Sequence, residues 1–197
     1  RAGRRDQPPQ HGRDALGINA ERMVGETGVV AQEGRIGACI AAVGIGIDAA
    51  AMSRLVFSRT LDKYPDLKLI VHHFGGIVPM LEGRIGPGWD QIGARTSDED
   101  LDALRRSLKK RPLDYFKQNF HADTATFGGR GAALCGFDFY AMDHIIFASD
   151  CPFDPEKGPG YIRDTMKIID SMNFSQVDLD RLYRGNLEAL TGVKFFR

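Results

Sequence analysis

Long apolar runs and a net charge are both missing from this sequence of 197 residues. No stretch of about eighteen apolar residues occurs, and the first residues lack the apolar core of a signal peptide, so we expect a cytoplasmic protein with no membrane contact. Lys plus Arg and Asp plus Glu both number 26, so the net charge of zero gives no attraction to nucleic acid or anionic lipid. The expected partner is a small molecule or another protein chain.

Cysteine is also scarce. The three cysteines, Cys39, Cys135 and Cys151, are an odd number without CxxC spacing, which is typical of reduced thiols and excludes a disulfide framework. The apolar share of 43% is ordinary for a globular chain, and the length allows one domain with a sizeable core.

Aromatic residues and lysine are absent from the first quarter of the chain. Every Phe, Trp and Tyr lies at or after Phe57 and every lysine at or after Lys63, while residues 1–48 are rich in Arg, Gly and Ala. We therefore expect residues 1–48 to be an atypical leader, disordered or poorly matched to the remainder. Its only histidine, His11, stands in a polar, turn-like setting and is not expected to bind a ligand.

From Ala49 onward, helical and strand patterns alternate. Apolar residues at helical spacing predict a helix from Ala49 to Tyr64, and Pro65-Asp66 should stop it. Apolar runs at 67–71, 120–124 and 145–148 read as buried parallel strands with helices between them. A complete barrel of eight such units needs about 250 residues, so we expect an α/β fold in which residues 49–197 form the C-terminal part of a TIM barrel.

Two further helices carry capping signals. Ser97 followed by Asp100 predicts a capping box before the leucines that begin at Leu101, and Ser175 with Asp178 predicts another helix start. Gly185 should end that second helix.

Polar side chains follow two of the predicted strands. His72 and His73 come directly after the run that ends at Val71, and Asp150 follows the run at 145–148. In barrels of alternating strands and helices, the carboxyl ends of the strands carry the active site. A histidine and an aspartate in such positions indicate a metal site.

These residues belong to a longer pattern that resembles the amidohydrolase-related family, in the layout of aminocarboxymuconate-semialdehyde decarboxylase. The resemblance covers about residues 49–193. It is carried by His73, Gly75-Gly76, Pro79, Gly83-Arg84, Ala122-Asp123-Thr124, Ser149-Asp150-Cys151-Pro152-Phe153 and Gly185-Asn186.

The resemblance implies a role for each of three residues. Asp150 would bind a divalent metal, zinc or alternatively manganese, and His73 would move a proton close to that ion. Arg84 would reach across a homodimer interface to a carboxylate of the substrate, a task for which a guanidinium fork is suited. Relatives also hold the ion with an HxH pair on the first strand and a histidine on a middle strand. The HxH pair has no counterpart here, so Asp150 alone is not expected to hold zinc.

Other polar residues near the strand ends have structural interpretations. Strand alternation would turn His72 to the side opposite His73. Asp123 is expected to bond neighbouring loops, His144 is expected to be structural, and the role of His121 stays open. Cys151 lacks a base that would activate it.

The function that follows is a metal-dependent carboxy-lyase acting on a small unsaturated or aromatic carboxylic acid. Hydrolysis of a lactone or amide is the alternative within the family. A different class of answer is a truncated, inactive chain that packs against a partner.

Overall fold

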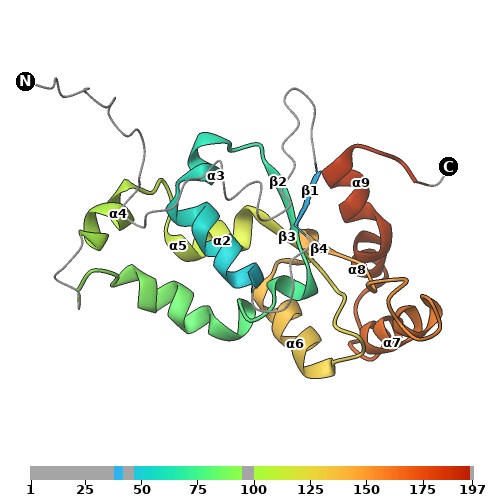
Figure 1. Cartoon of the computed structure of the whole chain (residues 1–197). Coiled ribbons are helices and arrows are strands. Elements are labelled where there is room, and N and C mark those ends of the chain that lie inside the picture. The colour runs from blue at the N-terminus through green and yellow to red at the C-terminus, as the bar shows by residue number, and fades with distance from the viewer. Residues whose placement is uncertain (1–37, 42–46, 95–99, 196–197) are drawn as a thin grey trace, which may run out of the picture.

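The computed structural model describes residues 38–41, 47–94 and 100–195, and its centre is a parallel sheet (Figure 1). Four strands lie in the order β1 (Ala38–Ala41), β2 (Lys68–Val71), β3 (Phe120–Asp123) and β4 (Ile145–Ile146). Each strand pairs in parallel with the next one along the chain. Because every crossover advances in the same direction, the sheet grows as the wall of a barrel does, and the intervening helices lie on one face.

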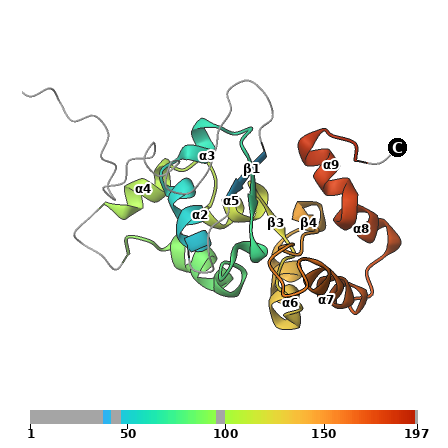
Figure 2. The same ribbon diagram turned by 45° about the vertical axis from the view of Figure 1, so that its right-hand side comes forward.

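The helices fill the crossovers and follow the last strand. Their bounds are α2 (Ile47–Phe57) and α3 (Thr60–Lys63) before β2, α4 (Leu101–Ser107) and α5 (Pro112–Gln118) before β3, α6 (Arg130–Phe139) before β4, and then α7 (Pro159–Asp170), α8 (Gln176–Asp180) and α9 (Asn186–Thr191). Turning the molecule shows α7, α8 and α9 together on the side of the sheet away from α2 to α5 (Figure 2).

The two faces of the sheet bury different sets of side chains. On the first face Leu69 and Val71 of β2 join the main core, to which α2, α5 and α6 contribute Val56, Phe116 and Phe139. On the second face Ile70 and Ile146 pack against Leu190 of α9. Because side chains alternate along a strand, Asp123, which is paired with Ile146, lies on this second face. The first face builds the core, and the second carries polar groups to the end of the sheet.

Most predicted elements are present, with shifted ends. The helix expected from Ala49 to Tyr64 is split into α2 and α3, because Arg59 has a φ of 60°. The cap of α4 is Asp100, whose carboxylate accepts from the backbone N–H of Ala103 at 2.8 Å, while Ser97 lies outside the described residues. Ser175 caps α8 as predicted.

The expectation that Gly185 ends a helix was wrong. Gly185 has a φ of −57°, and the π-helical segment Arg181–Gly185 connects α8 directly to α9. The glycine that ends a helix with a left-handed φ is Gly192, at 71°.

Most of the leader expected at residues 1–48 lies outside the described residues. Within it, β1 pairs with β2 from Ala38 opposite Lys68 to Ala41 opposite Val71.

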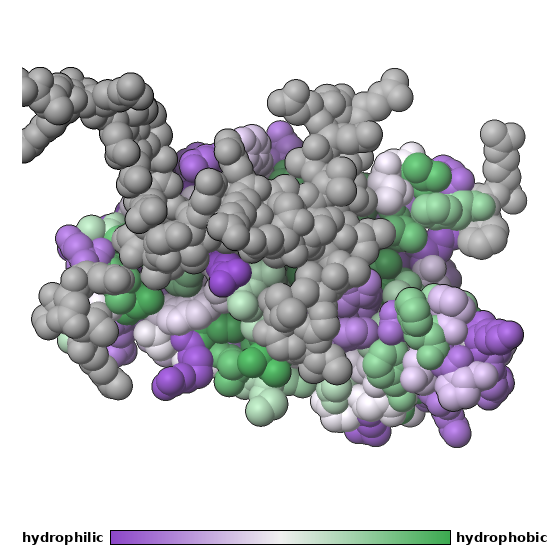
Figure 3. All heavy atoms as spheres, viewed as in Figure 1, coloured by the Kyte–Doolittle hydropathy of each residue, from purple (hydrophilic) through white to green (hydrophobic). Residues whose placement is uncertain are grey.

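Hydrophilic side chains gather at the two ends of one face, over α4 and over α7 (Figure 3). No helix in the described ranges is long and apolar enough to cross a membrane.

Candidate active site at the carboxyl ends of the strands

The loop after β2 has an unusual backbone. The run His73–Gly76 has φ angles of 51°, 55°, 74° and 63° in succession. Only the two glycines adopt this region without cost, so His73 and Phe74 must be held there by their surroundings. Phe74 is held by packing: it is 2% exposed, and a Cβ on Gly136 of α6 would lie 2.2 Å from its ring.

The carboxylate of Asp123 connects both histidines of this loop. Its Oδ1 accepts the backbone N–H of His73 at 2.8 Å, and its Oδ2 lies 3.0 Å from Nδ1 of His72. The expectation that the histidines point to opposite sides was therefore wrong, and their ring centroids are 5.8 Å apart. His72 has an extended backbone and lies on the face of Asp123, as alternation predicts. The alternation breaks at His73, whose left-handed φ of 51° brings its ring to the same side. The structural bond expected of Asp123 is present.

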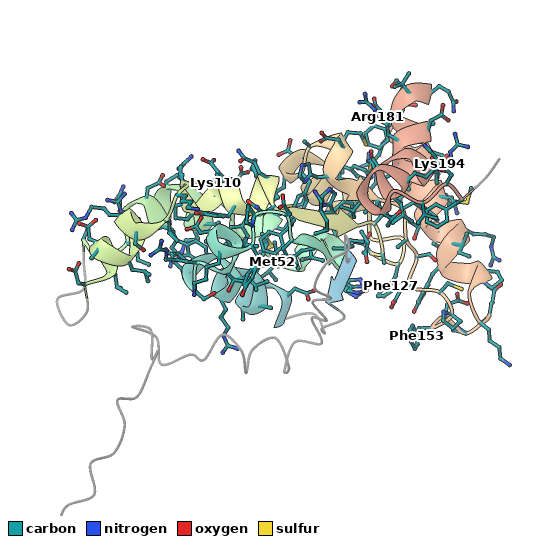
Figure 4. The ribbon with its side chains drawn as sticks, turned by 90° about the horizontal axis from the view of Figure 1, so that it is seen from above. Met52, Lys110, Phe127, Phe153, Arg181 and Lys194 are labelled. Atoms are coloured by element: carbon teal, nitrogen blue, oxygen red, sulfur yellow. The ribbon has the colours of Figure 1, made fainter. Side chains whose placement is uncertain are left out.

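The imidazole of His73 is fixed by a neighbouring carbonyl. Its Nδ1 lies 2.5 Å from the carbonyl oxygen of Ala125. Because a carbonyl oxygen only accepts, Nδ1 carries the hydrogen, and neutral His73 keeps a lone pair on Nε2. Phe127 meets the ring edge-on at 5.3 Å and is followed by Tyr161 at 4.4 Å. Phe127 and Phe153, from the loops after β3 and β4, lie on the same side of the molecule, away from Lys110 and Arg181 (Figure 4).

Asp150 begins the loop after β4. It is half-buried, has a φ of 63°, and its carbonyl oxygen accepts from the N–H of Phe153 at 3.1 Å. The loop is anchored by Thr124, whose hydroxyl donates to the carbonyl of Ala148 at 2.8 Å and accepts its N–H at 3.0 Å. Asp123 and Thr124 thus bond the end of β3 to the loop on each side of it.

The three carboxylates around His72 favour its charged form. The hydrogen bond to Asp123 is the largest cause that raises the pKa of His72, burial opposes it, and the charges of Asp123, Asp48 and Asp150 add to the increase. His72 and Asp150 are therefore within electrostatic reach of each other at the same end of the sheet.

Asp48 is a site residue that the sequence analysis missed. It lies in the first turn of α2, is 2% exposed, and its Oδ2 has no hydrogen-bond partner among the described residues. Burial raises its pKa from 3.8 to about 6, against the opposing effect of His72 and His73. An acidic first-turn residue preceded by Gly-Ile-Gly-Ile was the available signal, but it fell at the edge of the supposed leader.

Arg84 stands apart from these groups. It is exposed at the start of the π-helical segment Arg84–Gly88 and makes no ion pair or hydrogen bond with another described residue. Its predicted role at a homodimer interface stays a prediction.

A second pair of histidines lies toward the amino ends of the strands. His121 and His144 stack with ring centroids 4.5 Å apart, and Nδ1 of His144 lies 2.8 Å from the carbonyl oxygen of Phe120. Burial, followed by the neighbouring His144 and Lys68, lowers the pKa of His121 to about 4. This pair contacts neither His73 nor Asp123 through a hydrogen bond in the described part of the chain, so His144 reads as structural, as expected. Cys151 is exposed as a free thiol.

The described residues do not form a complete metal site. Within the described ranges, no three His, Cys, Asp or Glu side chains converge as metal ligands. The two oxygens of Asp123 and Nδ1 of His73 are engaged in the contacts above. Besides Asp150, the atoms left without a hydrogen bond to the described residues here are Nε2 of His73, Nε2 of His72 and Oδ2 of Asp48. A catalytic zinc ion needs at least three protein ligands.

Parallel strands in sequence order, with polar side chains at their carboxyl ends, are the arrangement found in barrel enzymes. Within that class, this chain belongs to the amidohydrolase family, whose sequence profile matches residues 7–191. The predicted fold, a partial (β/α)8 barrel of the α/β class, is thereby confirmed.

Two curated relatives are gamma-resorcylate decarboxylases. The protein from Polaromonas sp. is 26% identical over 137 residues, which is 70% of this chain and 38% of that protein. The protein from Rhizobium sp. is 28% identical over 103 residues, or 51% and 28% of the two chains. This chain therefore spans well under half the length of these relatives.

Solved structures show the same fold. Dihydroxybenzoic acid decarboxylase from Polaromonas sp., with bound manganese and the inhibitor 2-nitroresorcinol, is 25% identical with a TM-score of 0.56 over 73% of this chain and 39% of that one. The apo form of IDCase from Metarhizium anisopliae is 16% identical, with a TM-score of 0.61. The match covers 74% of this chain and 39% of that one.

Proposed function

We propose that this chain is part of a metal-dependent carboxy-lyase that removes CO2 from a small aromatic or unsaturated carboxylic acid. The observation that carries the proposal is the fixed imidazole of His73, with Nδ1 on the carbonyl of Ala125 and Nε2 left available at the strand ends. The curated relatives are named as decarboxylases of an aromatic acid, which supports the same substrate class for this chain.

His73 has the properties of a proton donor to carbon. Protonated His73 gives its Nε2 proton to the ring carbon that bears the carboxylate, because Nδ1 stays bonded to Ala125. The carbon–carboxylate bond then breaks, its electron pair returns to the ring, and CO2 leaves. The ring carbon thus exchanges CO2 for a proton, and His73 is left neutral.

The other predicted residues act on the same substrate. Asp150 would hold a divalent ion, and Arg84 would orient the carboxylate from a partner subunit by a bidentate contact. The described residues do not complete an ion site, so no step is assigned to the ion. Sequence analysis favoured zinc, whereas manganese is the metal named in the related structure, and both belong in the assay.

The test is CO2 release from 2,6-dihydroxybenzoate and related acids by the purified chain with manganese or zinc. We expect release that is lost in His73→Asn and in Asp150→Asn. Asp143→Asn is the matched control for Asp150, because Asp143 is exposed and precedes β4 rather than following it. Equal release by His73→Asn and the unmodified chain would contradict the role of His73.

A parallel assay with lactones and amides separates the reaction classes. Hydrolysis without CO2 release would overturn the carboxy-lyase assignment in favour of a hydrolase. No turnover in either assay by the metal-loaded chain would overturn it in favour of a chain that is inactive on its own.

A further inference from the structure

The Asp123 carboxylate forms a closed set of bonds around His73. Its Oδ1 accepts the backbone N–H of His73 at 2.8 Å and that of Ala125 at 3.0 Å. The carbonyl of Ala125 in turn holds Nδ1 of His73 at 2.5 Å. One carboxylate therefore sets both the backbone of His73 and the position of the carbonyl that fixes its ring.

This restraint is needed because the local backbone is strained. His73 and Phe74 adopt left-handed φ angles of 51° and 55°, which non-glycine residues rarely adopt. Asp123 is 4% exposed, so without it the N–H groups of His73 and Ala125 would have no water to replace the lost acceptor. The conformation of the His73 loop and the direction of its imidazole depend on the same bonds.

His72 completes the arrangement from the other side. Its Nδ1 lies 3.0 Å from Oδ2 of Asp123, so the carboxylate is held at both oxygens and cannot rotate away from His73. Nε2 of His72 is buried and has no hydrogen-bond partner among the described residues. Among the described residues, the contact with Asp123 is therefore the polar contact that orients the His72 ring.

We propose that Asp123, oriented by His72, is a positioning residue that fixes the backbone and the imidazole tautomer of His73. The inference deepens the proposed function, because it rests on His73 being the proton donor, yet the tautomer can be measured without any activity.

The test is nitrogen-15 NMR of the chain labelled at histidine, recorded at a pH above the raised pKa of His72, so that the tautomer of that ring is defined. His73→Asn and His72→Asn assign the signals of the two rings. In the unmodified chain we expect His73 to carry its hydrogen on Nδ1. A mixture of the two His73 tautomers would overturn the proposal.

Asp123→Asn gives the sharpest outcome. The amide oxygen of the new side chain can still accept the backbone N–H groups of His73 and Ala125. Its NH2 group then faces His72, so Nδ1 of His72 has to accept a hydrogen bond. We expect His72 to move its hydrogen to Nε2, while His73 keeps its own on Nδ1. In Asp123→Ala both histidines should become tautomer mixtures, and an unchanged His73 in that folded variant would refute the positioning role.

Three further variants serve as controls for the test. His72→Gln, whose amide can still donate to Asp123, should preserve the His73 tautomer, and His72→Ala should weaken it. The exposed Asp143→Asn should leave both rings unchanged. If the tautomers behave as expected but no CO2 is released, the proposed function fails while the positioning of His73 stands.

Discussion

The two histidine pairs differ in what surrounds them. The first pair, His72 and His73, lies at the carboxyl ends of the strands and shares one buried carboxylate. The second pair, His121 and His144, stacks ring on ring toward the amino ends, beside Lys68. The pKa of His72 is raised and that of His121 is lowered to about 4. The charged form of histidine is thus favoured at His72, at one end of the sheet, and disfavoured at His121, at the other.

The largest expected effect is on catalytic activity, which should fall on substitution in the first histidine pair but not in the second. His73→Asn should lower kcat for CO2 release by about 10²- to 10⁴-fold, the usual range for losing a general acid. His144→Asn should change kcat by less than about tenfold, because it removes no transition-state contact. Steady-state kinetics of both variants decides, and equal losses would remove the functional distinction between the pairs.

The second effect concerns stability. Asp123→Ala should lower the free energy of unfolding by about 3–5 kcal/mol, because buried N–H groups and His72 lose their partner. Asp143→Ala, at an exposed position before β4, should change it by less than about 0.5 kcal/mol. Urea denaturation monitored by circular dichroism measures both. A small effect of Asp123→Ala would mean that the first pair is not held by its carboxylate.

Asp48 adds a buried acid next to the first pair. Its pKa is about 6 in the folded chain and 3.8 in the reference state, so its ionisation costs stability as the pH rises through this window. Asp48→Asn should therefore raise the free energy of unfolding by on the order of 2 kcal/mol at neutral pH or above, with no gain below the lower pKa. Denaturation at pH values on either side of the window checks the sign. A gain at acid pH would contradict burial as the cause.

The smallest expected effect is on the pH dependence of stability, and its sign should be opposite at His72 and at His121. The raised pKa of His72 gives stability that is present below 6.5 and is lost as the pH rises through the folded-state pKa. The lowered pKa of His121 costs stability as the pH falls from 6.5 to about 4. We expect His72→Gln to destabilise mainly at acid pH and His121→Gln to stabilise there. Thermal unfolding against pH shows whether the two curves diverge as stated.

The repetitive parts of the structure could be predicted from sequence because they depend on local pattern. The apolar run at 67–71 and its Pro65-Asp66 boundary predicted β2, and helical spacing from Ala49 onward predicted α2. Ser175 was readable as a cap because its hydroxyl bonds three residues ahead. Gly185 was misread, since a glycine permits a left-handed φ without requiring one.

The site was predictable only in part, because local sequence patterns locate strand ends but not contacts between distant elements. His73 and Asp150 could be proposed as site residues because strand ends can be located from apolar runs. The relative orientation of His72 and His73 was misjudged because the left-handed φ of 51° at His73 cannot be read from the local pattern. Asp48 was missed because its burial arises from contacts between elements distant in sequence, which no local pattern shows.

The most direct test of whether His73 and Asp150 share one site uses manganese as a paramagnetic probe. Manganese added to the histidine-labelled chain should broaden the signals of His73 and His72 first and most strongly, with His144 affected last, and Asp150→Asn should remove the preference. Equal broadening of all histidines, or broadening of His144 before His73, would show that the ion does not bind at the carboxyl ends of the strands.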